Sequence, residues 1–121
     1  MKEVHCIISL GSNTDASHHL QQAYNLLVRA YPNITFSPIK ETEPIGMHHN
    51  HSPFYNRVAR FTTDQDADEV HAALKVERFC GRRPDDKEHE TIHIDIDLLA
   101  HGDTIIKPID FAQYQHDIEN L

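Results

Sequence analysis

The residues from His93 to Leu99 constrain the fold most, because apolar and charged side chains alternate along them as His-Ile-Asp-Ile-Asp-Leu-Leu. Successive side chains of a strand point to opposite faces of the sheet, so the isoleucines face a core and Asp95 and Asp97 face away from it. Their carboxylates then lie about 7 Å apart on one rigid element. Mg²⁺ prefers such oxygen ligands and completes its shell with water and phosphate oxygens. The stretch predicts a Mg²⁺–phosphate site; the alternative is an edge strand with one solvated face.

Length, charge and cysteine usage exclude several classes of protein. A chain of 121 residues predicts one domain over 1–121. It contains no apolar run near the roughly 18 residues of a membrane span and no signal-peptide core. Cys6 and Cys80 form no CxxC motif, which favours a reduced, cytoplasmic protein. The net charge of −8 argues against a nucleic-acid binder, and a phosphate ligand needs locally placed cations.

Three of the eleven histidines, His48, His49 and His51, cluster between Gly46 and Pro53. Imidazoles at this spacing are possible ligands of a transition metal. The alternative is a polar loop with incidental histidines. The sequence favours the loop, because the cluster contains no cysteine or carboxylate.

The apolar spacing along the chain predicts alternating strands and helices in the order β-α-β-β-α-β, followed by a short appendage. The expected segments are a strand over 3–10, a helix over about 16–31, a strand over 34–42, a strand over 54–63, a helix from Asp66 to Gly81, a strand over 92–99 and, after a turn at Gly102, a short strand over 104–106. Pro38 places the second strand at an edge or splits it in two. The tail over 111–121 is interpreted as polar and helical.

This order is typical of the ferredoxin-like βαββαβ pattern, an α+β fold with an antiparallel sheet and two helices on one face. The helix over 16–31 has an apolar stripe at helical spacing, formed by Leu20, Ala23, Tyr24, Leu27 and Ala30. Gly11 precedes this helix in a strand-to-helix turn, but the chain contains neither a GxxxxGK nor a GxGxxG phosphate loop.

Three short segments together resemble the 6-hydroxymethyl-7,8-dihydropterin pyrophosphokinase family of folate biosynthesis. They are residues 7–13, residues 41–46 with 53–58, and residues 94–99. Each is short, but their order and separation are specific, and the resemblance covers about residues 4–106. It implies Mg²⁺-dependent transfer of the β,γ-diphosphate of ATP to the hydroxymethyl oxygen of the dihydropterin, with release of AMP.

The resemblance also implies roles for individual residues. Two Mg²⁺ ions, with ATP as co-substrate, are held by Asp95 and Asp97, which count as catalytic together with Arg82. The pterin-binding residues are Thr42, Pro44, Ile45, Phe54 and Asn56. The nucleotide-binding residues are Glu77, Arg82, Arg83, Leu98 and His116. An aromatic ring suits a flat pterin, and an asparagine amide offers the paired donor and acceptor that the pterin edge needs. The expected partners are these small molecules, with neither nucleic acid nor membrane, and the chain is expected to be a monomer or homodimer.

Two departures from the family favour a different interpretation. Residues 88–95 read Glu-His-Glu-Thr-Ile-His-Ile-Asp, where the family carries arginines and a tryptophan. The chain also ends without the family's final strand, as in a short, C-terminally truncated member. These departures favour a degenerate, non-catalytic relative that binds a pterin or nucleotide, or a small interaction module. The retained pterin and aspartate residues favour the enzyme.

Overall fold

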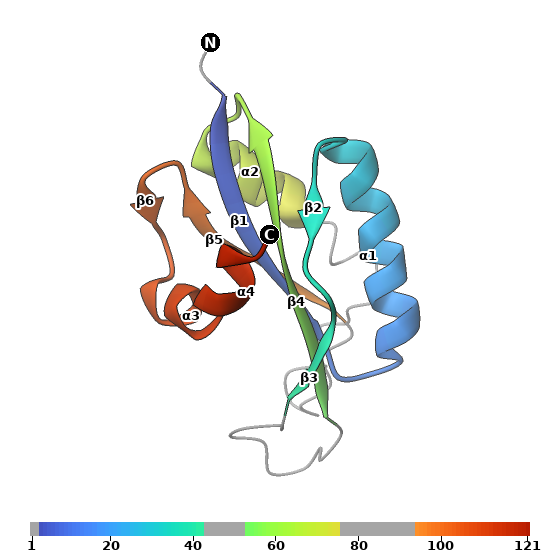
Figure 1. Cartoon of the computed structure of the whole chain (residues 1–121). Helices are drawn as coiled ribbons and strands as arrows, with labels where there is room; N and C mark the ends of the chain where they lie inside the picture. The colour runs from blue at the N-terminus through green and yellow to red at the C-terminus, as the bar shows by residue number, and fades with distance from the viewer. Residues whose placement is uncertain (1–2, 43–52, 76–93) are drawn as a thin grey trace.

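The computed structural model describes residues 3–42, 53–75 and 94–121. These residues form an α+β structure, in which an antiparallel sheet of six strands carries helices on both faces (Figure 1). None of the described helices is long and apolar enough to cross a membrane.

Strand β1 (Val4–Ser12) runs through the middle of the sheet and pairs on both sides with antiparallel neighbours. One neighbour is β4 (Phe54–Thr63), and the other is β5 (Asp95–His101). The short strands β2 (Thr35–Phe36) and β3 (Lys40–Thr42) both pair with β4, and β6 (Thr104–Ile105) pairs with β5. The strand order is β2-β4-β1-β5-β6, which confirms the antiparallel prediction. The predicted second strand is split into β2 and β3 around Pro38, which has no N–H to donate.

Helices α1 (Ala16–Ala30) and α2 (Ala67–Ala73) cover one face of the sheet. Their apolar side chains meet those of the three long strands in the main core, where Tyr31 stacks on Phe61 with ring centroids 3.9 Å apart. Asp66 and Glu69 form the capping box at the start of α2. The end predicted at Gly81 lies outside the described residues.

The predicted stripe of α1 is correct at Leu20, Ala23 and Leu27, which are buried, but wrong at Tyr24 and Ala30, which are exposed. Tyr24 packs against the ring of Phe36 at the margin of the helix, with ring centroids 4.8 Å apart. The sequence pattern therefore gives the direction of the apolar face but overestimates its width.

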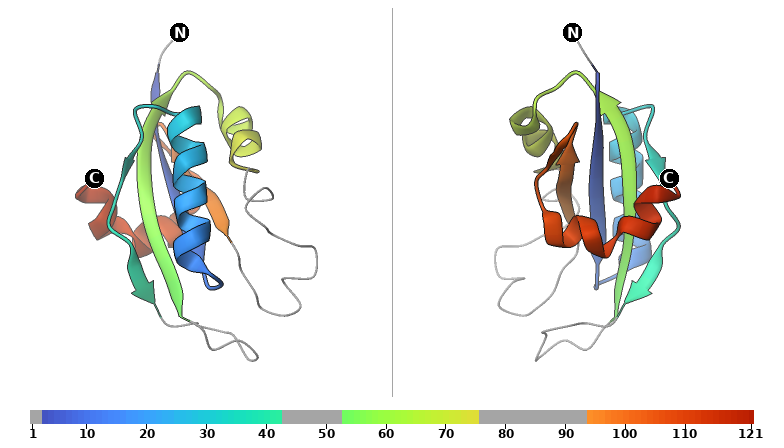
Figure 2. Two further views of the ribbon diagram at one scale, coloured as in Figure 1. Left: turned by 90° about the vertical axis from the view of Figure 1, so that its right-hand side faces the viewer. Right: turned by 60° about the vertical axis from the view of Figure 1, so that its left-hand side comes forward.

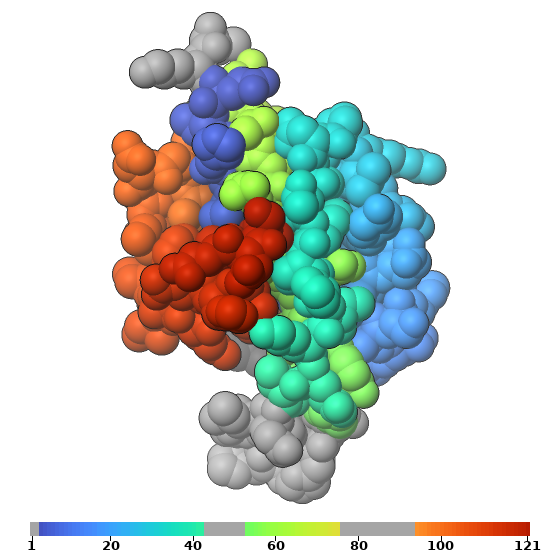
Figure 3. All heavy atoms as spheres, in the orientation of Figure 1, coloured from blue at the N-terminus to red at the C-terminus, as the bar shows by residue number. Residues whose placement is uncertain are grey.

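The second face of the sheet carries two short helices, α3 (Pro108–Gln113) and α4 (Gln115–Glu119). Figure 2 shows them on the side of the sheet opposite to α1, and Figure 3 shows the C-terminal residues filling the surface between β5–β6 and β2–β3. Apolar side chains of this segment pack against Ile7, Leu99 and Ala100; they are Phe111, Tyr114, Ile118 and Leu121.

This packing corrects two predictions. The tail is helical as expected, but it is not simply polar, because its apolar side chains recur at helical spacing and form a second core. Helices consequently lie on both faces of the sheet; the expectation of one helical face holds for α1 and α2 alone. The ion pair between Lys40 Nζ and Asp117 Oδ1, at 2.7 Å, also ties α4 to β3.

Truncation of a side chain in this second core should destabilise the protein. We expect Ile118→Ala to lower the free energy of unfolding by about 1–2 kcal/mol, below the range for a fully buried isoleucine because Ile118 is only half-buried. Ile109→Ala, at a position that is 84% exposed, is the matched control and should change it by less than about 0.5 kcal/mol. Urea unfolding measures both variants, and equal effects would contradict the second core.

Candidate functional site

A row of three paired residues crosses the centre of the sheet. Gly11 on β1 pairs with Asn56 on β4 and with Asp95 on β5. Residues directly opposite one another in adjacent strands share a face, so Asn56 and Asp95 project from the same side. That side is the second face, because the alternate residues Leu10 and Ile96 are buried in the main core.

Asp97 belongs to the same face, two residues along β5 from Asp95 and opposite Ser9. The apolar residues between and beside them, Ile94, Ile96 and Leu98, are buried in the main core, as the alternating pattern predicts. Both aspartates are half-buried. The sheet thus presents two carboxylates on one rigid strand, with their apolar neighbours holding that strand in place.

Thr42 and Asn56 contact each other across the β3–β4 pair. The Asn56 amide Nδ2 donates a 2.7 Å hydrogen bond to Thr42 Oγ1. The other side of the amide lies over β1, where an ideal Cβ built on Gly11 would come 2.7 Å from Asn56 Oδ1. Phe54, half-buried and two residues before Asn56 on β4, belongs to the same face. Glycine at position 11 therefore leaves room for the amide orientation that Thr42 fixes.

Lys107 reaches the acidic pair from the residue before α3. Its Nζ lies 2.9 Å from Asp97 Oδ1, and the two side chains are 43% and 44% exposed. The hydrogen bond to Asp97 is the main cause that raises the pKa of Lys107; partial burial opposes it, and the charges of Asp97, Asp110 and Asp95 add to it. Sequence reasoning missed Lys107, because it is the reversal of the chain between β5 and β6, together with the packing of α3 against β5, that brings it to Asp97.

Tyr114, the residue between α3 and α4, also lies within electrostatic range of Asp97. Burial is the main cause that raises its pKa, followed by the charges of Asp110, Asp117 and Asp97. The C-terminal helices therefore place an aromatic hydroxyl, kept protonated at neutral pH, on the face that carries the aspartates.

A cavity of about 310 Å³ adjoins Asp97 on β5. Its lining comes from α2, β5 and the segment leading to α3, and comprises Ala67, Asp68, His71, Asp97, Leu98, Ile106 and Lys107. The lining therefore includes Asp97 and Leu98 of the predicted nucleotide and metal residues.

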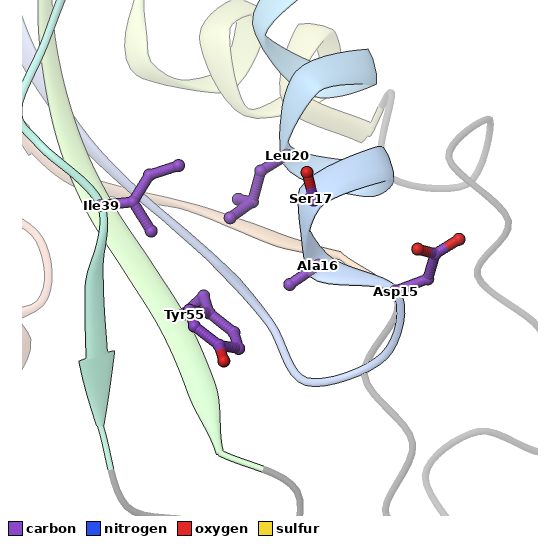
Figure 4. A pocket seen from close by; sticks show the side chains of 6 residues that line it. All are labelled: Asp15, Ala16, Ser17, Leu20, Ile39 and Tyr55. Atoms are coloured by element: carbon purple, nitrogen blue, oxygen red, sulfur yellow. The ribbon is translucent and has the colours of Figure 1, made fainter.

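A larger cavity of about 440 Å³ opens on the other face, between the start of α1 and strands β3–β4 (Figure 4). It is lined by Asp15, Ala16, Ser17, Leu20, Ile39 and Tyr55. Tyr55 precedes Asn56 on β4 and points the opposite way, into the face of α1. Of the predicted site residues that the structure describes, none lines this cavity, although it is the larger of the two.

Several predicted residues lie outside the described part of the chain. They are Pro44, Ile45, Glu77, Arg82 and Arg83, together with the histidine cluster of His48, His49 and His51. His116 is described and is exposed on α4, where its backbone carbonyl accepts a hydrogen bond from Asn120. Its role as a nucleotide ligand stays a prediction.

Asp95 and Asp97, two residues apart on β5, fit a metal that takes few protein ligands. The described residues contain no group of three or more histidine, cysteine, aspartate or glutamate side chains able to hold an ion. Zinc-type sites need three or four such ligands, whereas Mg²⁺ is usually bound by one or two carboxylates plus water and phosphate. The contact of Asp97 with an ammonium group shows that this carboxylate is accessible to a cation.

The amino-acid sequence matches one known protein family over most of its length. The family model described as 7,8-dihydro-6-hydroxymethylpterin-pyrophosphokinase matches residues 7–117, and the chain belongs to that family. A search of curated proteins found no match. The match includes every predicted site residue and, in addition, Lys107.

The contact between Gly11 and Asn56 can be tested by a double-mutant cycle. Gly11→Ala should displace the Asn56 amide and break its bond to Thr42, which lowers the free energy of unfolding by about 1 kcal/mol. Thr42→Val, which removes the same bond's acceptor, should cost about as much. Because both act on one bond, we expect the double variant to lose clearly less than the sum. Strict additivity in urea unfolding would show that Gly11 does not act through Asn56.

Proposed function

We propose that this member of the pyrophosphokinase family transfers diphosphate from ATP to 6-hydroxymethyl-7,8-dihydropterin in a Mg²⁺-dependent reaction. The observation that carries the proposal is the row Asn56–Gly11–Asp95. Neighbouring strands are spaced about 4.8 Å apart, so Asn56 and Asp95 project from backbones about 10 Å apart. A pterin bound at Asn56 can span this distance and bring its hydroxymethyl group towards the acidic pair.

The strand order supports assignment to the ferredoxin-like fold. Strands β4, β1 and β5 lie side by side in antiparallel pairs, β2 and β3 together extend the sheet beyond β4, and α1 and α2 pack on one face. The predicted βαββαβ pattern has this arrangement when β2 and β3 count as one interrupted strand. Strand β6 and helices α3 and α4 are then additions after its last strand.

Thr42 and Asn56 would orient the pterin. Because one Asn56 N–H is engaged by Thr42, the amide keeps its second N–H and its carbonyl oxygen for the ligand. This is the paired donor and acceptor that the amide-like edge of a pterin requires. Phe54 would supply an apolar surface for the ring, with Pro44 and Ile45 completing the pocket.

Asp95 and Asp97 would hold the metal, with two ions as the family resemblance implies. A metal held by these carboxylates would supply positive charge that offsets the charge developing on the phosphates during transfer. The protein's own contribution is to fix both carboxylates on β5, with their separation set by the strand. Leu98 lines the adjoining cavity and fits a place beside the nucleotide, which Glu77, Arg82, Arg83 and His116 would complete.

A non-catalytic pterin- or nucleotide-binding protein is the second candidate. Asp97 is already paired with Lys107 in this structure, and residues 88–95 contain no arginine. A metal would therefore have to compete with Lys107 for Asp97, and residues 88–95 offer no guanidinium group to a triphosphate. This candidate predicts binding of the pterin without release of AMP.

The activity is tested by AMP release from ATP and Mg²⁺, with and without hydroxymethyl-dihydropterin. We expect pterin-dependent AMP release by the wild type and a loss of about a hundredfold or more in Asp95→Asn, because the variant removes charge that organises the phosphates. Asp103→Asn, in the exposed turn between β5 and β6, is the matched control and should keep the wild-type rate.

Circular dichroism of Asp95→Asn should match the wild type, because removing one of two like charges relieves repulsion. Pterin binding without AMP release by the wild type would support the non-catalytic candidate. Full activity in Asp95→Asn would exclude the metal role of Asp95.

A further inference from the structure

We propose that Lys107 is a built-in cation of the acidic pair, which neutralises Asp97 before the metal binds and contacts the polyphosphate afterwards. This inference rests on the proposed function and adds a phosphate-binding residue to it. It assigns to the C-terminal segment a part of the charge that a phosphate site needs.

The backbone around Lys107 is anchored beside β5. The amide N–H groups of Ile106 and Lys107 both donate to the carbonyl oxygen of Leu99, at 2.8 and 3.2 Å. Pro108 then begins α3, whose Phe111 packs on the second core. The lysine Cα is therefore held by backbone hydrogen bonds and apolar packing. Its four-carbon side chain is flexible enough for the ammonium group to contact different nearby oxygens.

The ion pair is suited to exchange. Both side chains are nearly half-exposed, and an exposed pair of this kind contributes little free energy because water and salt screen it. A divalent cation with its higher charge can displace the ammonium from Asp97 at small cost. A fully buried pair would instead resist replacement, because separation would leave an uncompensated charge.

The cavity beside the pair needs a local cation. Asp68 and Asp97 line it, and Lys107 is the one lysine or arginine among its described lining residues. Asp95 and Asp110 add further negative charge within range of Lys107. With Asp97 given over to a metal, the Lys107 ammonium would remain at the wall of this cavity, where phosphate oxygens would be its nearest new partners.

The test measures metal and nucleotide binding separately in Lys107→Met. Mn²⁺ binding without nucleotide, followed by electron paramagnetic resonance, should tighten about threefold, because the competing ammonium is gone. Binding of Mg²⁺ with a non-hydrolysable ATP analogue, followed by calorimetry, should weaken about tenfold, because a charge-assisted contact to phosphate is lost. Changes of opposite sign distinguish this role from a structural one, which would weaken both.

Two further variants control the experiment. Lys107→Arg keeps the charge and should retain both affinities within about twofold. Arg29→Met removes one positive charge from the exposed last turn of α1, on the other face, and should change neither affinity.

The inference is overturned if Lys107→Met leaves the Mn²⁺ affinity unchanged or weaker, or keeps the nucleotide affinity within twofold of the wild type. A wild type that binds the nucleotide normally while Lys107→Met has no effect refutes this inference alone. A wild type that binds neither Mn²⁺ nor the nucleotide refutes the proposed function together with it.

Discussion

The double pairing of β1 is the constraint on which the rest of the structure depends. Strand β1 is hydrogen-bonded to β4 on one side and to β5 on the other. The face of the sheet to which each β1 side chain points therefore also fixes the face for the paired residues of both neighbours. Leu10 lies on the face covered by α1 and α2, and so do Arg57 and Ile96, which pair with it. Gly11 lies on the opposite face together with its partners, Asn56 and Asp95. A slip of one residue in either pairing would turn Asn56 or Asp95 into the apolar core, which their polar groups strongly disfavour.

The second face changes character along its length. At one end of β1 it carries Ile7, covered by the C-terminal helices, and at the other it carries Ser9 and Gly11, beside the polar site. A register shift between Ile7 and Ile8 inserts one extra residue into β5, so that Leu99 and Ala100 both join the second core. The irregularity thereby gives the C-terminal helices an apolar surface to pack on, directly after the strand segment that carries the aspartates.

The sequence predicts those features whose causes are local. The burial of Ile94 and Ile96 follows from strand alternation, the splitting of the second strand from Pro38, and the start of α2 from the reciprocal bonds of Asp66 and Glu69. The residues themselves did not single out Asn56 as a partner of Thr42 in the site, because an asparagine at a strand end is commonly just a polar surface residue. The family resemblance was needed to select it.

The features that the sequence did not reveal depend on contacts between distant segments. Four apolar residues of the tail recur at helical spacing, but the surface that they cover, here Ile7 and Leu99, belongs to distant strands and is known only from the fold. Lys107 is ten residues from Asp97 and reaches it because the β5–β6 turn reverses the chain. Tyr24 fits the helical period, yet it lies at the margin of the stripe, where the width of the sheet decides exposure.

Any phosphate ligand of this chain must overcome electrostatic repulsion from a negatively charged protein. The net charge of −8 disfavours approach of a bare polyphosphate, but repulsion between exposed charges is largely screened beyond about 8 Å at physiological salt. Whether a polyphosphate binds therefore depends on the charged groups close to the site. There the carboxylates of Asp95 and Asp97 are useful only when a cation lies between them and the phosphates, whereas the ammonium of Lys107 is attracted to phosphate directly. Under the proposed function, a nucleotide that arrives with its metal would satisfy both requirements at once, since the metal would take the carboxylates and leave the lysine for the phosphates.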